Sequence, residues 1–394
     1  MRILVVAPFF PPDPAGSGVF AAQQAASLAG RGHEVLVVTN TSRPWSSAQV
    51  GEETQPVNGV EVLRVRGFRL KAGTLTWNYR IPFSFLGLMS SSPHKKIRAF
   101  NPERIIVHSV LFDLSLWGLW TSWRRGCKSI LIVHTALWHE WVAVRTAMSV
   151  YVTCILRPLI RRAKSKVVCV DDWTFSHSKR LIDSVRSLSV IPVSITEGSM
   201  RGGDGSAVRE RFDLGFGPIL LSLGHVVPVR DRLRLVRSLP LILEKHPTLK
   251  LVVVGTPFDT RFLELAEDLG VRDRIILTGP VRHEEISDFL AISDVEAHDL
   301  DGRGLGITSI EAMDAGVPIV AWVNRTMPPH DQLLRYDSLA LLDDGDPETI
   351  ASMIDRLLTD KGFRELVVST QRTVVREIFS EETATIRYLN LLTD

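Results

Sequence analysis

The sequence predicts an α/β protein of two domains, each with a parallel sheet. Short apolar runs alternate with helical stretches along its 394 residues, as in sheets whose strands are joined by helices. This length exceeds what one hydrophobic core usually spans. A stretch from Pro192 to Phe216 is rich in glycine and poor in apolar residues, and we interpret it as the connection between the domains.

The first domain opens with an apolar strand, a loop rich in proline and glycine, and a helix. The strand is predicted at Ile3 to Ala7, and the helix after the loop at Val19 to Ala29. Later apolar runs predict buried strands at Glu34 to Thr39, Ile105 to Val107, Ile130 to Val133 and Val167 to Val170. Residues 41–98 give no clear pattern; they are polar at first and aromatic from Trp77 onward.

The second half shows the same alternation. Strands are predicted at Ile219 to Leu223, Leu251 to Val254, Ile275 to Leu277, Val295 to Ala297, Ile319 to Val323 and Leu339 to Leu341. Helices are predicted after Pro347, up to the end of the chain. This order of elements again indicates a parallel sheet.

The composition is that of a soluble globular protein, with 45% hydrophobic and 23% charged residues. The cysteines Cys127, Cys154 and Cys169 have no metal-ligand spacing, so we expect a reduced, cytoplasmic chain. The first apolar run is too short for a signal peptide. No run of about 20 apolar residues is present, and we therefore expect no membrane span.

The small net charge of +2 conceals an asymmetry between the halves. Residues 1–190 carry 24 Lys and Arg against 11 Asp and Glu, and the remainder carries 22 against 33. One interpretation is that opposite charges help the two domains meet. The other is that the basic half contacts an anionic acceptor or an anionic membrane surface. Nucleic acid is not expected as a partner, because no recognisable binding module is present.

The most informative segment extends from Gly304 to Pro318. Its glycines predict a loop, its apolar residues a short helix, and Gly316 the end of that helix before a buried strand. Glycines at a helix start let a phosphate approach the backbone, where free N–H groups and the helix dipole favour an anion. Glu311 lies within the helix, where its carboxylate can accept hydrogen bonds from a diol such as a ribose.

This segment resembles the nucleotide-sugar signature of retaining glycosyltransferases of family 4, which have the GT-B fold. The resemblance implies two Rossmann-like domains separated by a cleft, and a last helix that crosses back to the first domain. The expected boundaries are 1–192 for the acceptor domain, 193–216 for the linker, 217–375 for the nucleotide-sugar domain and 376–394 for the crossing helix. The family signature has a glutamate where this chain has Arg303. Arginine cannot accept a proton, but it can hold a carboxylated sugar or a diphosphate.

The resemblance also implies the residues of the site. Gly224 to Arg230 is similar to the family segment in which two cations hold the donor diphosphate. Arg230 replaces the family lysine and keeps its charge, and His225 replaces the family arginine. The donor-binding residues implied are Ser17, Gly18, Gly224, His225, Arg230, Gly255, Gly304, Gly306, Ile307, Thr308 and Glu311. The catalytic residues implied are His134, Arg230 and Arg303. For Ser17 and Gly18, an ordinary glycine loop is the alternative interpretation.

Three histidines are candidates for the acceptor side. His134 matches the family histidine at the end of the corresponding strand, and His108 follows the preceding strand in the same way. Open α/β sheets bind ligands at the carboxyl ends of their strands. His139 is assigned to the acceptor with them. A zinc site formed by the three is the weaker alternative, because their spacing is not that of zinc ligands.

The sequence therefore predicts a retaining, metal-independent glycosyltransferase. Its donor would be a nucleotide sugar, which is a substrate and not a cofactor, and its acceptor a glycan, a lipid-linked molecule or a small molecule. The altered positions Arg303 and His225 also leave open a degenerate, non-catalytic nucleotide-sugar or glycan-binding subunit. A sugar-nucleotide epimerase is less favoured. The basic stretch from Arg157 to Lys166 indicates either a solvated helix face or peripheral contact with the inner face of a membrane.

Overall fold

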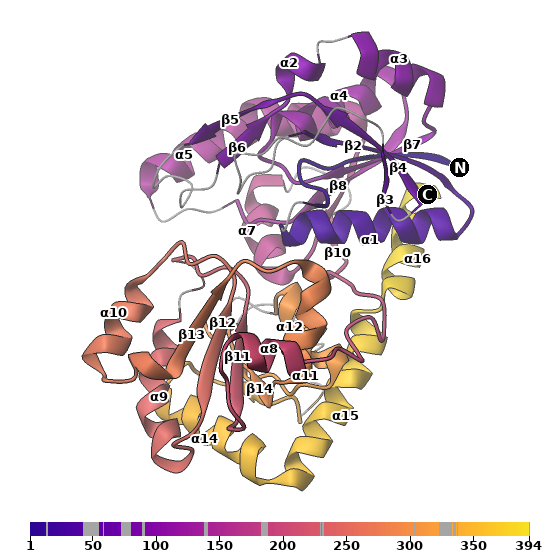
Figure 1. The fold of residues 1–394 in the computed structure, drawn as a ribbon. Helices are drawn as coiled ribbons and strands as arrows, with labels where there is room; N and C mark the ends of the chain where they lie inside the picture. Colours follow the sequence, from indigo (N-terminus) through magenta and orange to yellow (C-terminus); the bar gives the residue numbers. More distant parts are fainter. Residues whose placement is uncertain are drawn as a thin grey trace. The chain divides into compact units, whose positions relative to one another are not determined.

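The structure, a computed structural model, divides the chain into two compact units (Figure 1). Unit 1 comprises Met1–Val193 and Glu381–Asp394, and unit 2 comprises Ser194–Ser380. The structure describes residues 1–12, 15–41, 55–57, 59–71, 80–88, 91–137, 141–182, 188–228, 230, 232–302, 305–322, 333, 336 and 338–393.

Unit 1 is built around a sheet that has eight strands in the described residues, in the order β10-β9-β8-β7-β1-β2-β4-β3. Its strands are β1 (Arg2–Val6), β2 (Glu34–Asn40), β3 (Gln55–Val57), β4 (Val60–Val65), β7 (Arg104–His108), β8 (Lys128–Val133), β9 (Lys166–Cys169) and β10 (Leu188–Val190). All neighbouring pairs are parallel except β3 with β4. The central strands are apolar throughout because helices cover both faces of the sheet.

The two faces of this sheet carry separate hydrophobic cores, and Figure 1 shows α1 and α4 on opposite sides. The helices of unit 1 are α1 (Gly16–Gly30), α2 (Phe85–Leu88), α3 (Ser91–Phe100), α4 (Asp113–Arg125), α5 (Val142–Tyr151), α6 (Arg157–Ala163), α7 (Asp172–Ile182) and α16 (Glu381–Thr393), and the strands β5 (Phe68–Lys71) and β6 (Arg80–Phe83) form a hairpin. Helix α16 buries Ala384, Tyr388 and Leu392 in the core that contains α1.

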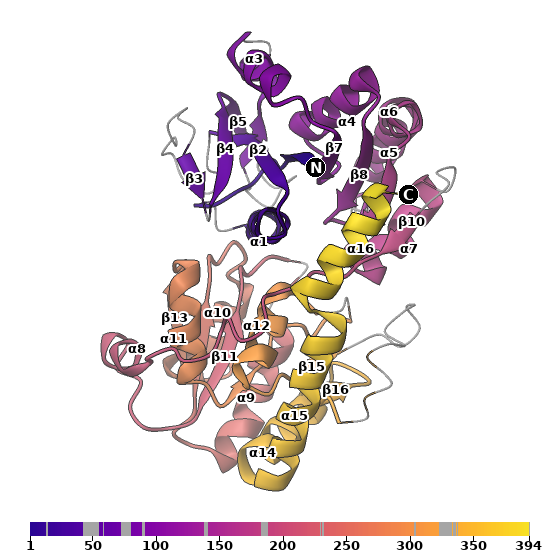
Figure 2. The ribbon, with the colours of Figure 1, turned by 90° about the vertical axis from the view of Figure 1, so that its right-hand side faces the viewer.

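Unit 2 has a smaller parallel sheet in the order β13-β12-β11-β14. Its elements are α8 (Ser206–Arg211), β11 (Ile219–Leu223), α9 (Leu233–Lys245), β12 (Lys250–Val254), α10 (Arg261–Asp268), β13 (Ile275–Gly279), α11 (Ile286–Ala291), β14 (Val295–Glu296), α12 (Ile307–Ala315), β15 (Ala321–Trp322), β16 (Leu341–Leu342), α14 (Pro347–Thr359) and α15 (Lys361–Ile378). The buried Gln371 of α15 bonds both the N–H and the carbonyl of Ile319. Figure 2 shows α15 and α16 in yellow.

Sequence predictions differ from the structure at three places in this unit. The strand predicted at Leu339 to Leu341 begins only at Leu341, where β16 starts. Within the predicted strand from Ile319 to Val323, Ala321 and Trp322 pair with β16, and Ile319 forms an isolated bridge to Glu296. Val323 lies outside the described residues. The linker is predicted at residues 193–216, but all of it except Val193 belongs to unit 2, and it contains α8. A Cβ on Gly203 would lie 2.2 Å from the carbonyl oxygen of Ser287. Gly203 therefore allows the chain to pack closely on α11.

The chain passes from unit 1 to unit 2 at residue 194 and returns at residue 381. Helix α15 ends at Ile378 within unit 2, and α16 begins at Glu381 within unit 1. The return therefore lies between two helices, and not at the start of a single helix from residue 376. Ile195 pairs with Ser380, and its N–H donates to the carbonyl of Phe379 at 3.0 Å, so the two crossing segments are hydrogen-bonded to each other.

One helical stretch changes the expectation about membrane spans. Helix α5, a π-helical turn η2 (Val152–Leu156) and α6 form a continuous run from Val142 to Ala163, whose most apolar window has a mean hydropathy of 1.3 and is only 17% buried. By length and composition alone this run can cross a membrane, contrary to the expectation from the sequence. Arg145, Arg157, Arg161 and Arg162 lie within this helical run, so the sequence contains no uninterrupted run of about 20 apolar residues here.

Candidate functional site

The helix of the glycine signature, α12, begins at Ile307 with Gly306 as its N-cap residue. Asp299, in the loop after β14, holds this start: its Oδ2 accepts from the N–H of Gly306 at 2.6 Å and from the hydroxyl of Ser309 at 2.9 Å. Burial would raise the pKa of Asp299, but the charges of His298 and Arg230 and these hydrogen bonds lower it below its usual value. The carboxylate is therefore a fixed negative charge.

Arg230 lies over the same glycine. Its Nε is 3.7 Å from Oδ1 of Asp299, and its side chain remains 38% exposed. A Cβ on Gly306 would approach the Nη1 of Arg230 to 2.8 Å, so a side chain at this position would displace the guanidinium. Glycine at 306 thus permits a partly exposed cation beside the N–H groups of Ile307 and Thr308, which lie in the first turn of α12.

Two glycines and a buried arginine shape the neighbouring turns. Gly224 has φ +104° and Gly255 has φ +137°, and a Cβ on Gly255 would lie 2.5 Å from the carbonyl oxygen of Gly224. Arg232 is 1% exposed and donates to the carbonyls of Arg230, Leu223 and Gly224. Arg232 therefore fixes the loop that carries Arg230. The burial of Arg232 is not predicted by the sequence, because an arginine before an apolar helix carries no signal of burial.

His225 is a neutral group in this structure. Its Nδ1 accepts from the N–H of Thr256 at 3.0 Å. Burial and, to a smaller extent, the charge of Arg232 lower the pKa of His225 below its usual value. The imidazole therefore carries its proton on Nε2 at neutral pH and provides a hydrogen-bond donor without a charge.

Glu311 is almost fully buried in α12, 1% exposed, and is paired with a histidine that the sequence analysis did not single out. The Nε2 of His283, in a 3₁₀ turn after β13, lies 2.8 Å from its Oε1. This hydrogen bond to Glu311 raises the pKa of His283; burial acts against it, and the charges of Glu311 and Glu284 add to it. His283 therefore orients Glu311.

A third histidine, His298, lies between β14 and the first turn of α12. The Nδ1 of His298 is 2.5 Å from Oε1 of Glu296, and its Nε2 is 3.1 Å from the hydroxyl of Thr308. Both Glu296 and His298 are almost completely buried. This chain of hydrogen bonds joins the end of β14 to the first turn of α12. Arg303 and Gly304, which the resemblance assigns to the site, lie outside the described residues.

The site residues expected in unit 1 divide into two groups. Ser17 and Gly18 lie in the first turn of α1, and a Cβ on Gly18 would come within 3.1 Å of the backbone of Phe9 and Phe10. The N–H of Gly18 donates to the carbonyl of Ala15 at 2.8 Å. In this structure Gly18 thus serves the packing of α1 on the preceding loop.

The second group is a pair of histidines at the carboxyl ends of the adjacent strands β7 and β8. The Nδ1 of His108 lies 2.9 Å from the Nε2 of His134, and the rings are stacked with centroids 5.2 Å apart. Burial lowers the pKa of His134 to about 4, and burial together with the charge of His134 keeps the pKa of His108 well below its usual value. Both rings are therefore neutral at pH 7. His139 lies outside the described residues.

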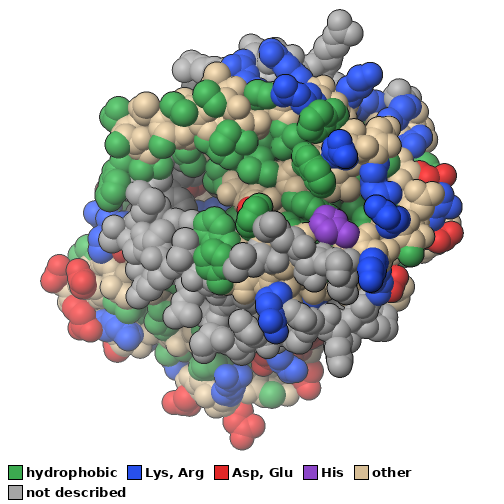
Figure 3. Space-filling view, turned by 90° about the horizontal axis from the view of Figure 1, so that it is seen from above, with side chains coloured by type: hydrophobic (Ala, Val, Ile, Leu, Met, Phe, Trp, Pro, Cys, Tyr) green, Lys and Arg blue, Asp and Glu red, His purple; other side chains and the backbone are tan. Residues whose placement is uncertain are grey.

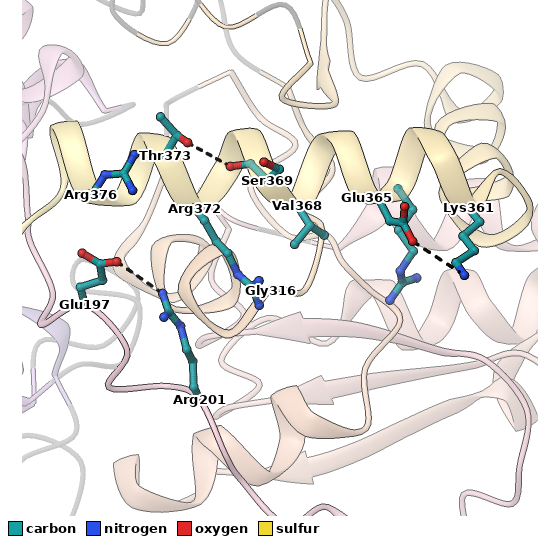
Figure 4. A pocket seen from close by; sticks show the side chains of 11 residues that line it. Glu197, Arg201, Gly316, Lys361, Glu365, Val368, Ser369, Arg372, Thr373 and Arg376 are labelled. Carbon is teal, nitrogen blue, oxygen red and sulfur yellow. Dashed lines mark hydrogen bonds and ion pairs between the residues drawn. The ribbon is translucent and has the colours of Figure 1, made fainter.

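Among the described residues, no group of three or more His, Cys, Asp or Glu has the arrangement of a metal site. Unit 2 has a pocket of about 750 Å³ at the other end of α12, shown in Figure 4. Its lining includes Arg201, Gly316 and Arg372 but none of the residues expected to bind the donor. There the buried Asp314 accepts hydrogen bonds from Gly198, Met200 and Arg201.

Comparison with solved structures shows the fold. Sucrose-phosphate synthase from Thermosynechococcus elongatus superposes with a TM-score of 0.72 at 16% identity, over 99% of this chain and 97% of that chain. HepE from Anabaena, in a complex with UDP and glucose, superposes with a TM-score of 0.71 at 16% identity over the whole of both chains. The chain therefore has the GT-B fold.

Curated relatives match over part of their length. A GDP-mannose-dependent alpha-(1-6)-phosphatidylinositol monomannoside mannosyltransferase of Mycobacterium tuberculosis is 28% identical, over 52% of this chain and 57% of that protein. A D-inositol 3-phosphate glycosyltransferase of Acidothermus cellulolyticus is 29% identical, over 50% of this chain and 46% of that protein. The matched part of this chain thus spans about half the length of these relatives.

Two family models match consecutive parts of the chain. The model described as a glycosyl transferase 4-like domain matches residues 15–181, and the model of glycosyl transferases group 1 matches residues 209–373. The first covers most of the sheet with the histidine pair, and the second contains Arg230, Asp299 and Glu311. Between them they cover most of the chain, which therefore belongs to the group 1 glycosyltransferases.

Proposed function

We propose that this protein transfers a sugar from a nucleotide sugar to a hydroxyl of a phosphorylated or lipid-linked polyol, with retention of configuration and without a metal. The observation that carries the proposal is the start of α12. There the partly exposed Arg230 lies over Gly306, and the buried Glu311 follows in the same helix. A cation beside free N–H groups suits a diphosphate, and an oriented carboxylate suits the ribose diol.

The proposed roles follow from charge. The departing nucleotide carries negative charge on its diphosphate, which Arg230 and the N–H groups of Ile307 and Thr308 would stabilise. These groups supply the positive charge that a metal ion supplies in other transferases, and this supports a metal-independent reaction. Glu311 would accept hydrogen bonds from the ribose hydroxyls. His225 would donate a neutral hydrogen bond to a diphosphate oxygen. Retention is proposed from the resemblance to family 4.

The acceptor class is proposed from the relatives and from charge. The relatives named above act on phosphatidylinositol mannoside and inositol 3-phosphate, and both molecules combine a polyol with a phosphate. The excess of Lys and Arg in residues 1–190 favours an acceptor of this kind in unit 1. Nucleic acid is not part of the proposal.

A peripheral membrane location at the cytoplasmic face is proposed from the surface formed by α4, α5 and α6. Its exposed apolar side chains are Trp120, Trp123, Trp141, Val142, Val150 and Ile155. Arg124 lies over the ring of Trp120 and Arg162 over the ring of Trp123. Tryptophan beside arginine is the combination found at the boundary between lipid headgroups and acyl chains. Figure 3 shows hydrophobic side chains gathered on one face, with Lys and Arg beside them.

Sedimentation with vesicles tests this location. We expect binding to vesicles that contain phosphatidylserine, and about a 100-fold loss when Arg161, Arg162 and Lys164 are changed to Gln, since each contributes about 1 kcal/mol near an anionic surface. Removing three exposed cations of unit 2, by Arg237→Gln, Arg261→Gln and Lys361→Gln, is the matched control and should retain most of the binding. No binding by the unaltered protein would refute the membrane proposal.

Titration calorimetry with a panel of nucleotide sugars, followed by turnover assays, tests the function itself. We expect one donor to bind selectively, Glu311→Ala to abolish that binding, and Glu311→Gln to weaken it. Glu264→Ala, in the exposed part of α10, is the control and should bind normally. Transfer to phosphatidylinositol or inositol phosphate should proceed unchanged in EDTA.

The second candidate is a non-catalytic nucleotide-sugar or glycan-binding subunit. Two observations favour it: Arg303 replaces the family glutamate, and His225 supplies no charge where the family has an arginine. Tight binding of a nucleotide sugar without hydrolysis or transfer to any acceptor of the panel would support this candidate over the transferase.

A further inference from the structure

We propose that Gln24 and His108 are positioning residues that fix which ring nitrogen of His134 carries the proton, so that His134 offers its bare Nδ1 to a substrate hydroxyl. The catalytic meaning of this inference rests on the function proposed above. The protonation pattern itself is a property of the free protein and can be measured without any substrate.

The fold brings the three side chains together. Strands β7 and β8 are parallel neighbours, with His108 paired to Ile132, so His134 lies just beyond the same edge of the sheet. Gln24 comes from α1, which covers this part of the sheet, and its Oε1 lies 3.1 Å from the Nε2 of His108. The three side chains therefore form a row of hydrogen bonds that runs from Gln24 through His108 to His134.

The row determines the protons if both rings are neutral, as their lowered pKa values indicate. A neutral imidazole has one N–H donor and one bare acceptor nitrogen. The Gln24 Oε1 only accepts, so the Nε2 of His108 carries the proton and its Nδ1 is bare. The Nε2 of His134 must then donate to that Nδ1, which leaves the Nδ1 of His134 as an acceptor.

The surroundings hold this arrangement in place. Phe20 meets both rings edge-on, with centroids 6.0 Å from His108 and 5.5 Å from His134. His108 is only 1% exposed, so water does not compete for its nitrogens. The row of hydrogen bonds therefore begins at Gln24 and ends at His134.

Gln24 is otherwise hard to explain. The other buried residues of α1 are Gly18, Phe20, Ala21, Ala22, Ala25 and Leu28, all without polar side-chain atoms. The Nε2 of Gln24 is buried and has no hydrogen-bond partner among the described residues, which is costly. An apolar residue would fit the helix better, unless the amide oxygen is needed by His108.

The consequence is a distinct role for His134 in the proposed reaction. Its bare Nδ1 can accept a hydrogen bond from a hydroxyl of the sugar or of the acceptor. With the opposite arrangement of protons, the Nδ1 of His134 would donate a hydrogen bond, and the hydroxyl oxygen would have to accept it. Gln24 and His108 would thereby affect the rate of transfer without contacting the substrates.

Nitrogen NMR of the ¹⁵N-histidine-labelled protein at pH 7 tests the proton pattern, with His134→Asn to assign the signals. We expect a protonated Nε2 and a bare Nδ1 for His134. In Gln24→Leu both nitrogens should move to intermediate shifts, because neither pattern is then favoured. Gln23→Leu, at the preceding position of the same helix, is the control and should leave the spectrum unchanged. A protonated Nδ1 in the unaltered protein would overturn the inference even if the variant failed to fold.

Kinetics tests the consequence. We expect Gln24→Leu to lower kcat about tenfold with the KM for the donor within twofold of the unaltered protein. Equal kcat values in an active enzyme would overturn the positioning role alone. No turnover by the unaltered protein with any donor would instead contradict the proposed function, and the NMR result would stand by itself.

Discussion

The carboxyl ends of β7 and β8 in unit 1 and those of β11 to β14 in unit 2 both carry polar side chains, but the first set is neutral and the second is charged. In unit 1, burial keeps His108 and His134 unprotonated. In unit 2, Asp299 retains its charge beside Arg230, and Glu311 raises the pKa of His283. The strand ends thus differ in charge between the two units. Under the function proposed above, the neutral set would suit hydroxyl groups and the charged set would suit phosphates.

The largest effect is expected at the charged set. Arg230→Gln should weaken the binding of a nucleoside diphosphate by about 10- to 100-fold, because a hydrogen bond to a charged group contributes about 1.5–3 kcal/mol. Binding of the corresponding nucleoside, which has no phosphate, should change less than twofold. Calorimetry with both ligands measures the difference.

Arg237→Gln is the control for this experiment, since Arg237 is exposed on α9 and is not among the residues proposed to bind the donor. An equal loss of nucleoside and diphosphate binding in Arg230→Gln would break the comparison, because Arg230 would then act through the structure of the loop and not through its charge.

The neutral set predicts a dependence of stability on pH. The pKa of His134 falls from about 6.5 in the unfolded chain to about 4 in the folded protein, so the unfolded chain binds more protons between these values. Stability is therefore complete above pH 6.5 and is lost as the pH falls towards 4. Between pH 7 and pH 5 this histidine should account for about 2 kcal/mol of the free energy of unfolding.

Urea denaturation of the unaltered protein and of His134→Asn at the two pH values isolates this contribution. The unaltered protein should lose about 2 kcal/mol more than the variant over the same interval. If both lost the same amount, His134 would be accessible to protons in the folded state, and the distinction between a neutral and a charged set would fail.

The smallest effect is expected at His225, which belongs to unit 2 but is neutral like the histidines of unit 1. His225→Asn should weaken diphosphate binding by less than about tenfold, because a neutral hydrogen bond contributes about 0.5–1.5 kcal/mol. The affinity of the unaltered protein should not rise between pH 8 and pH 6.5. A marked rise that is absent from His225→Asn would show that His225 becomes a cation when the ligand binds.

The sequence was sufficient for features that depend on neighbouring residues. The apolar run from Ile219 to Leu223 matches β11 residue for residue. Helix α12 ends where predicted, because Gly316 adopts a left-handed conformation, φ +85°, that favours glycine. The positions of His108 and His134 at strand ends also followed from local pattern.

Features made by residues far apart in the sequence were not predicted. His283 pairs with Glu311 across 28 positions, and Gln24 with His108 across 84. No spacing rule connects such residues, since only the packing of helices on the sheet brings them together. The burial of Arg232 has the same origin: its partners are carbonyl groups, and these leave no mark in the sequence.

Unit 2 is an uninterrupted insertion into unit 1, and its two ends are joined by the hydrogen bond from Ile195 to Phe379. A protein ending at Ser380 would lack only 14 residues, yet it would lose Tyr388 and Leu392 from the core around α1. Truncation of the tail would therefore damage the half of the molecule most distant from it along the chain, and leave the half next to it intact. The C-terminal helix is thus a structural part of the N-terminal half, whose hydrophobic core it completes.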